Sequence, residues 1–202
     1  MPSRKDEILD IATRLFAERG YEGASMGDLA ERVGLRKASL FHHYASKDEL
    51  YCAVLEQLVR RLGELVFTNA AGPGTFAERL DRMTVATFDA MVAEPFAAAL
   101  LIREMMDWGP FAKKHFDSLA KPVMEATTGF FESGQKEGAA KVQDARQVIL
   151  TVTSMNLMPF AIGQFIRCSY GTEPFSPDFI ASRREAIRAH ARAIVLLDAG
   201  KP

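Results

Sequence analysis

The sequence predicts an all-α protein, with a compact N-terminal helical unit followed by a larger helical body. Along most of the chain, apolar residues recur at intervals of three and four, the period of a helix with one buried face. No run of alternating β-branched residues is bounded by the tight turns that a β-hairpin requires. Clusters of Gly and Pro divide the chain into segments of ordinary helix length.

The first predicted helix lies at the N-terminus and ends near Gly20. One apolar stripe supports it, formed by Ile8, Ile11, Ala12, Leu15 and Phe16. Ser25 then stands three residues before Asp28, which is an N-cap arrangement for a second, very short helix that Gly34 ends.

A third short segment covers residues 36–44, with Leu40 as its inward residue. Ser46 and Glu49 have the spacing of a capping box and open a long helix that reaches about Thr68. Its apolar side consists of Leu50, Val54, Leu58, Leu62 and Leu65.

The Gly- and Pro-containing segment 70–75 separates this long helix from the next, predicted over about 76–94. Pro95, Gly109-Pro110, Pro122 and Gly138 then divide the middle of the chain into helices of moderate length. A longer helix is predicted from about Asp144 to Cys168, and a final one over 178–197.

Composition narrows the function classes. The 202 residues include 25 Lys and Arg against 26 Asp and Glu, and 48% of them are hydrophobic, as in an ordinary globular protein. These values exclude disorder as the main state and exclude a generally basic protein. Cys52 and Cys168 are too few for a disulfide framework or zinc module, so we expect two free, mostly buried thiols. The first residues contain no secretory signal, and we expect a cytoplasmic protein.

One stretch, from Gln147 to Ile166, has no formal charge and matches a membrane span in length. Polar residues are distributed through it, however, and Pro159 interrupts it. These features favour a helix buried on most sides over a membrane span.

Positive charge is concentrated locally. Residues 32–47 contain four cations (Arg32, Arg36, Lys37 and Lys47), two histidines and no acid. Cations mixed with hydroxyl and aromatic groups on a short helix suit contacts with phosphates and base edges. Charge alone is equally consistent with a solvated basic face.

The spacing around this window is that of a helix-turn-helix. Ala30 is small enough for a second helix to approach, and Gly34 permits the sharp turn. Val33, Leu35 and Leu40 would hold the two helices together. The outer side of residues 36–43 is then free to enter a DNA major groove.

Residues 8–55 resemble the DNA-binding domain of TetR-family transcriptional regulators, and the run 29–50 carries the resemblance. The family usually has Gly, Thr and Tyr where this chain has Ala38, Ser39 and Phe41, and often Ser in place of Arg36. The resemblance implies a DNA-binding domain over 1–47 and a helical domain for effector binding and dimerisation over 48–202. It further implies a repressor of a palindromic double-stranded DNA operator, modulated by a small, mostly apolar effector.

The resemblance also implies site residues. Ser25 and Met26 would face DNA, Phe41 and Tyr44 would combine packing with backbone contact, and Lys47 would bind phosphate at a helix N-terminus. The recognition helix would be lined by Arg36, Lys37, Ser39, His42 and His43. Adjacent histidines on a helix point about 100° apart and no carboxylate completes a site, so we expect no metal.

Large aromatic and methionine side chains are frequent in the body, and most of them must form its core. Several lie on the segments that surround the effector pocket in the resembled family, where Met-rich walls adapt to varied apolar shapes. The predicted ligand-binding residues are Phe88, Met91, Arg103, Met106, Trp108, Phe131, Met155 and Met158. Arg103 would meet either an anionic group of the ligand or a carboxylate inside the fold.

A homodimer through the last two long helices is also predicted. Ile180, Ile187 and Ile194 recur every seven residues, and several alanines between them permit close helix approach. The alternative is that both helices fill the core of a monomer.

No catalytic arrangement is recognisable, so we expect no enzyme and no cofactor. Two other functions stay open: a helical apolar-ligand carrier or adaptor without specific DNA binding, and an architectural DNA-binding protein without an effector.

Overall fold

The computed structural model describes residues 3–197, and most of this part of the chain is helical. The all-α prediction is confirmed. In chain order the helices are α1 (Arg4–Gly23), α2 (Met26–Val33), α3 (Lys37–His43), α4 (Lys47–Ala71), α5 (Phe76–Ala93), α6 (Pro95–Asp107), α7 (Pro110–His115), the π-helical turn η1 (Phe116–Ala120), α8 (Lys121–Lys136), α9 (Ala145–Ala161), α10 (Gly163–Tyr170) and α11 (Pro177–Val195).

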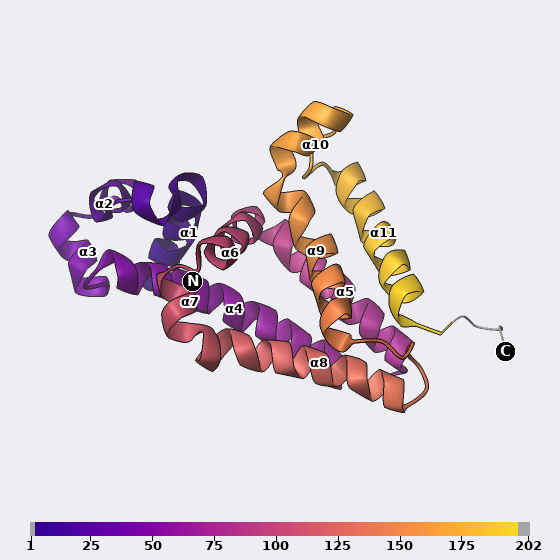
Figure 1. Ribbon diagram of the computed structural model, residues 1–202. Helices are drawn as coiled ribbons and strands as arrows, with labels where there is room; N and C mark the ends of the chain where they lie inside the picture. Colours follow the sequence, from indigo (N-terminus) through magenta and orange to yellow (C-terminus); the bar gives the residue numbers. More distant parts are fainter. Residues whose placement is uncertain (1–2, 198–202) are drawn as a thin grey trace.

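The molecule is elongated, with α1, α2 and α3 gathered at one end (Figure 1). Helix α4 runs from this end into the body, where α5, α8, α9 and α11 lie (Figure 1). Helix α6 packs against both α1 and α9 and therefore connects the two parts.

Local capping explains why the first helices begin where they do. The Ser25 hydroxyl accepts a hydrogen bond from the Asp28 backbone N–H at 3.1 Å, and the Asp28 side chain returns to the Ser25 backbone. Ser46 caps α4 in the same way, but the Glu49 side chain accepts from the Ala45 N–H at 2.7 Å, one residue earlier than a capping box requires.

Two helix ends differ from the sequence-based prediction. Helix α1 continues to Gly23, with a local break at Gly20 (φ 72°) instead of an end there. The single helix predicted over 144–168 is two helices, α9 and α10, bent by 73°. The backbone leaves the helical conformation at Ile162, three residues after Pro159, whose ring removes one helical hydrogen bond.

The carbonyl that Pro159 leaves without a helical partner has another donor. Arg183 of α11 donates from Nη2 to the Met155 oxygen at 2.6 Å, so the bend in α9 is fixed by a contact from α11. Within residues 3–197, no single helix is long and apolar enough to cross a bilayer.

The N-terminal unit has a core that extends into the body. One buried cluster joins apolar residues of α1, α2, α3 and the first half of α4 with Ala97 and Leu100 of α6 and Phe111 of α7. Two further clusters lie in the body, one around Leu80 and Phe131 and the other around Phe88 and Ile187.

The predicted isoleucine stripe of α11 needs correction. Ile187 is fully buried within the subunit, and Ile180 and Ile194 pack against the same clusters of the body. Helix α11 turns this stripe toward α5 and α9 of its own chain, which leaves the opposite face, with Ala189 and Ala193, exposed. Cys168 is exposed as well, so the expectation of two buried thiols holds only for Cys52.

Candidate nucleic-acid interface and internal cavity

The turn between α2 and α3 has the geometry that the helix-turn-helix spacing predicts. Gly34 adopts a left-handed conformation (φ 70°, ψ 32°), and its N–H donates to the carbonyls of the last turn of α2. The Leu35 N–H also donates to the Ala30 carbonyl, at 2.8 Å. Ala30 and Leu40 are buried where α2 and α3 meet, so α3 presents its other side to solvent.

The structure brings most of the predicted DNA-contacting residues to this outer surface. Five of them are exposed: Ser25, Arg36, Lys37, Phe41 and His42. Three are half-buried: Ser39, His43 and Lys47. Met26 and Tyr44 are buried and belong to the core of the unit. The Met26 side chain therefore packs inward instead of facing outward as predicted, and Tyr44 has a packing role.

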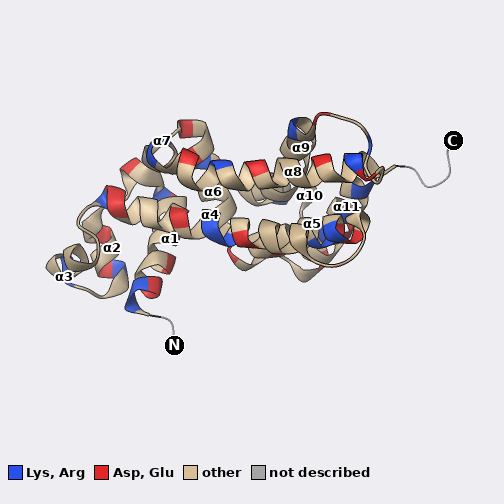
Figure 2. Ribbon diagram, turned by 90° about the horizontal axis from the view of Figure 1, so that it is seen from below, with Lys and Arg blue, Asp and Glu red and all other residues tan. Residues whose placement is uncertain are grey.

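Ion pairs separate the cations of this unit into two groups. Arg32 pairs with Glu18 at 2.9 Å and Arg19 with Asp28 at 3.1 Å, so both guanidinium groups are neutralised. The Ser25 hydroxyl and the Arg19 guanidinium hold the pKa of Asp28 below its usual range. Arg36 and Lys37, by contrast, form no ion pair with any described residue, and they stand at the start of α3. Figure 2 shows this end of the molecule with its charged residues coloured.

Lys47 at the start of α4 also has an internal contact. Its Nζ donates to the Tyr21 carbonyl at 3.0 Å and lies 4.2 Å from the centre of the Tyr21 ring. This contact connects α4 to α1. A phosphate contact by Lys47 would use the remaining N–H donors of the same ammonium group.

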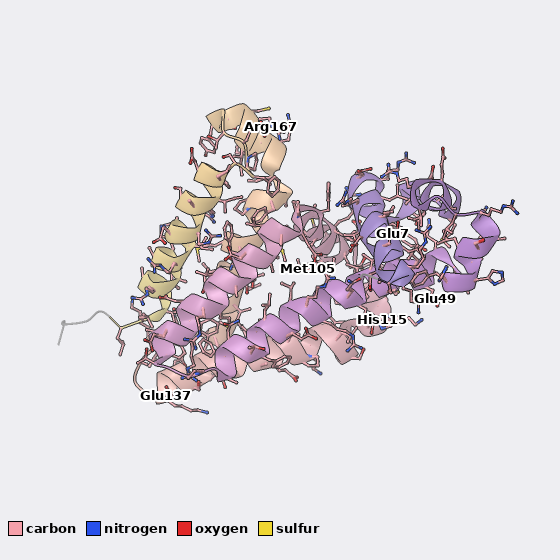
Figure 3. The ribbon with its side chains drawn as sticks, turned by 180° about the vertical axis from the view of Figure 1, so that it is seen from behind. Glu7, Glu49, Met105, His115, Glu137 and Arg167 are labelled. Atoms are coloured by element: carbon pink, nitrogen blue, oxygen red, sulfur yellow. The ribbon has the colours of Figure 1, made fainter. Side chains whose placement is uncertain are left out.

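A partly open cavity of about 290 Å³ lies in the body, lined by residues of α4, α5, α6, α7, η1, α8 and α9. Its walls are mainly apolar, as expected for a small-molecule site. The side chains that line it include Val59, Leu62, Val66, Met83, Leu101, Met105, Trp108, Phe111, Phe116, Val123, Phe131, Val152 and Leu157. Met105 lies near the middle of the molecule, between the N-terminal unit and the body (Figure 3).

Of the eight residues predicted to bind a ligand, Trp108 and Phe131 line this cavity. The structure places the other six elsewhere. Phe88 is fully buried in the neighbouring cluster and Met155 packs between two clusters. Met106 is 80% exposed and Met158 is exposed on the outer face of α9.

The remaining two predicted ligand residues face other surfaces. Met91 borders a separate groove beside α4, where charged Arg61, Glu64 and Glu94 make the lining less apolar. Arg103 is exposed and lies so close to Gly20 that a Cβ there would overlap its guanidinium group.

Glu104, the neighbour of Arg103, is the charged residue that enters the fold. It is 4% exposed and lines the cavity. One carboxylate oxygen accepts from the Tyr51 hydroxyl at 2.8 Å and the other from the Ala112 N–H at 2.6 Å. The sequence does not identify Glu104 as a buried residue, because consecutive helix positions point about 100° apart and their order does not reveal which one is buried.

The Tyr51 hydroxyl links this cavity to the N-terminal unit. The Tyr51 ring packs edge-on against Phe16 and Tyr21, with centroids 4.9 Å away in both cases. Burial, together with the adjacent Glu104, raises the pKa of Tyr51 far above its usual range, so the hydroxyl remains a donor. A hydrogen bond between residues 53 positions apart thus joins the cavity wall to α4 and α1.

Two family models match the chain. The model described as bacterial regulatory proteins of the tetR family matches residues 8–54, and that described as the tetracyclin repressor-like C-terminal domain matches residues 77–190. The first covers the helix-turn-helix and the start of α4. The second covers most of the body, including nearly all of the helices around the cavity.

Curated relatives match over part of their length. The HTH-type transcriptional repressor KstR2 of Rhodococcus jostii is 30% identical over 143 residues, 67% of each chain. The repressor AcnR of Corynebacterium diphtheriae is 42% identical over 66 residues, 33% of this chain and 35% of that protein. This chain therefore aligns with about a third of the length of AcnR.

Solved structures share the whole fold. The ketosteroid regulator KstR2 of Mycobacterium tuberculosis superposes with a TM-score of 0.79 at 19% identity, covering 98% of this chain and 97% of that one. The structure of AibR in complex with isovaleryl coenzyme A and operator DNA gives 0.73 at 19% identity, covering 95% and 98%. These similarities concern the arrangement of helices.

Proposed function

This chain belongs to the TetR family of bacterial regulatory proteins, whose members are transcriptional regulators and not enzymes, and we propose on that premise that it is a repressor controlled by a small molecule. It would bind a palindromic operator as a homodimer, through residues 1–47, and an effector through residues 48–202. Operator binding would place the protein in the cytoplasm, with the chromosome.

The observation that carries the proposal is the outer surface of α3. Arg36 and Lys37 are exposed cations without an acidic partner among the described residues, and the whole window 32–47 has no acid. Arg36 and Lys37 at the start of a short helix, with the exposed His42 in its last turn, suit phosphates and base edges in a major groove. Relatives named HTH-type transcriptional repressors support the same function.

Dimerisation through α9 and α11 is supported by the surface that these helices leave exposed. Leu150, Met158, Ile162 and Phe165 are exposed on α9, at its end and on α10. Beside them, the outer face of α11 includes the small residues Ala181, Ala189 and Ala193, at which a second copy could approach closely. An exposed apolar surface that both copies share suits a two-fold dimer, which would present two α3 helices to half-sites about 34–36 Å apart.

The effector would act through α4 and α6. The second half of α4 lines the cavity with Val59, Leu62 and Val66, and its start is attached to α1 by Lys47. Twenty-five residues give α4 a length of about 37 Å. A ligand that moved Glu104 would alter its contact with Tyr51 and, with it, the position of the N-terminal unit. The ligand must bind the two arrangements unequally, since equal affinity shifts no equilibrium.

Operator selection from random duplex DNA, followed by titration of the selected sequence, tests the proposal. Lys37→Ala should weaken operator binding and change the preference among operator variants. Lys136→Ala, which removes an exposed cation from the far end of α8, is the matched control and should bind like the parent. Equal affinity of the parent for operator and random duplex at physiological salt would contradict the proposal.

A further inference from the structure

Two polar atoms in the cavity wall have no hydrogen-bond partner among the described residues. They are Oγ1 of Thr84 on α5 and Oδ1 of Asn156 on α9, and both residues are 2% exposed. A buried polar group without a partner destabilises a folded protein, so such groups are uncommon in native structures. Two of them on packed helices, both lining one apolar cavity, indicate a ligand that supplies the missing partners.

Among the four threonines that line the cavity, Thr84 is the buried one. Thr153 likewise has no hydrogen-bond partner among the described residues, but it is exposed to solvent. The hydroxyls of Thr87 and Thr127 each donate to the carbonyl four residues earlier, at 2.8 and 2.7 Å. That local bond is the usual solution for a threonine within a helix. Thr84 does not form it, so its hydroxyl retains both its donor and its acceptor capacity for the cavity.

The orientation of the Asn156 amide is fixed by its own helix. Its Nδ2 donates to the Val152 carbonyl at 3.1 Å. Exchanging the amide oxygen and nitrogen would bring two acceptors together, so Oδ1 is the atom that remains available. Asn156 therefore offers an acceptor, and its ligand must bring a donor.

We infer that the effector is an uncharged, mainly apolar molecule with one hydroxyl group, held between Thr84 and Asn156; this inference rests on the effector site of the proposed function. A hydroxyl donates to Asn156 Oδ1 and accepts from the Thr84 hydroxyl, which satisfies both atoms. A ketone or ether has no donor for Asn156. A carboxylate has no donor either, and it would enter a cavity that already contains the carboxylate of Glu104.

Two isomers of equal size provide the test. 1-Octanol and heptyl methyl ether have the same atoms, but the ether cannot donate a hydrogen bond. Binding is followed by the fluorescence of Trp108, the single tryptophan, which lines the cavity. We expect the parent to bind the alcohol roughly 3- to 10-fold more tightly than the ether, the effect of about one hydrogen bond.

Variants assign this preference to the two residues. Thr84→Val and Asn156→Leu keep the side-chain size. Each should reduce the ratio of the ether dissociation constant to the alcohol dissociation constant toward one. Thr87→Val, whose hydroxyl is already bonded to Met83, is the matched control and should keep the parental ratio. Comparing each variant's ratio with the parental ratio cancels the different affinities of the two compounds for water.

Thermal unfolding adds a readout that does not depend on a ligand. Thr84→Val removes a hydroxyl without a protein partner, so its midpoint should equal or exceed that of Thr87→Val. The inference would be overturned if the parent bound alcohol and ether with nearly equal dissociation constants. It would also be overturned if Thr84→Val and Thr87→Val reduced the preference for the alcohol equally. The parental ratio needs no variant, so a misfolded Asn156→Leu protein would not remove the test.

These outcomes are separable from those of the proposed function. A protein that binds its operator but does not distinguish alcohol from ether refutes the hydroxyl site alone. A protein that prefers the alcohol through Thr84 but binds no operator refutes the proposed repressor and leaves the site intact. Failure of both compounds to bind, with normal operator binding, also overturns the hydroxyl site.

Discussion

Replacing Tyr51 by Phe removes one hydroxyl group from the interior and preserves the ring. The ring keeps its edge-on contacts with Phe16 and Tyr21. The lost hydroxyl is the donor to Glu104, which is 4% exposed and has one other donor among the described residues, the Ala112 N–H. The substitution therefore leaves one oxygen of a buried carboxylate without a partner.

The expected cost follows from that geometry. A hydrogen bond to a charged group contributes about 1.5–3 kcal/mol, and an unsatisfied buried acceptor costs a similar amount. We expect Tyr51→Phe to lower the free energy of unfolding by about 2 kcal/mol. For a chain of about 200 residues this lowers the thermal midpoint by roughly 4–8 °C.

Chemical denaturation of four proteins measures the interaction: the parent, Tyr51→Phe, Glu104→Leu and the double variant. Glu104→Leu also removes the acceptor of the Ala112 N–H. The double-mutant cycle separates the Tyr51–Glu104 interaction energy from the loss of that second hydrogen bond. Tyr21→Phe is the matched control, because its hydroxyl has no partner among the described residues. A coupling below about 0.5 kcal/mol, or equal midpoints for Tyr51→Phe and Tyr21→Phe, would refute the reasoning.

Three further results are expected. Gly34→Ala should cost about 1–2 kcal/mol of stability through its left-handed backbone alone, since a Cβ there meets no atom within 4 Å; a denaturation curve equal to that of the parent would contradict this. Leu150→Glu on the exposed face of α9 should convert the dimer to a monomer in light scattering, whereas unchanged mass would exclude this face from the interface. Because the folded-state pKa of Tyr51 is raised, the contribution of its hydroxyl to the free energy of unfolding is complete below about pH 10 and is lost as the pH rises further. The parent midpoint should therefore fall more steeply above pH 10 than that of Tyr51→Phe, and parallel profiles would contradict the shift.

The helix-turn-helix was predictable because its signals are local. Ser25 and Asp28 cap α2 with each other, Gly34 provides a left-handed turn, and Leu40 has the right spacing to pack beneath it. Each of these relations spans a few residues, so the sequence contains it directly.

The cavity was predictable only as a region. Trp108 and Phe131 line it, but the rotation of each helix about its axis depends on partners that are distant in sequence. Arg103 and Glu104 illustrate the difficulty: they are neighbours on α6, yet one is exposed and the other is buried through a partner 53 residues away. For the same reason, Asn156 was not distinguishable from the exposed polar residues of α9.

The core shared by α1, α4, α6 and α7 has a consequence for how operator specificity can be exchanged between relatives. A chimera joined at residues 47 and 48 would separate Leu40 and Phe16 from Leu100 and Phe111, which belong to the same buried cluster. The N-terminal unit is therefore a poor candidate for transplantation as a block. Grafting only the exposed residues of α3 leaves that cluster intact, and is the route to new specificity that this architecture permits.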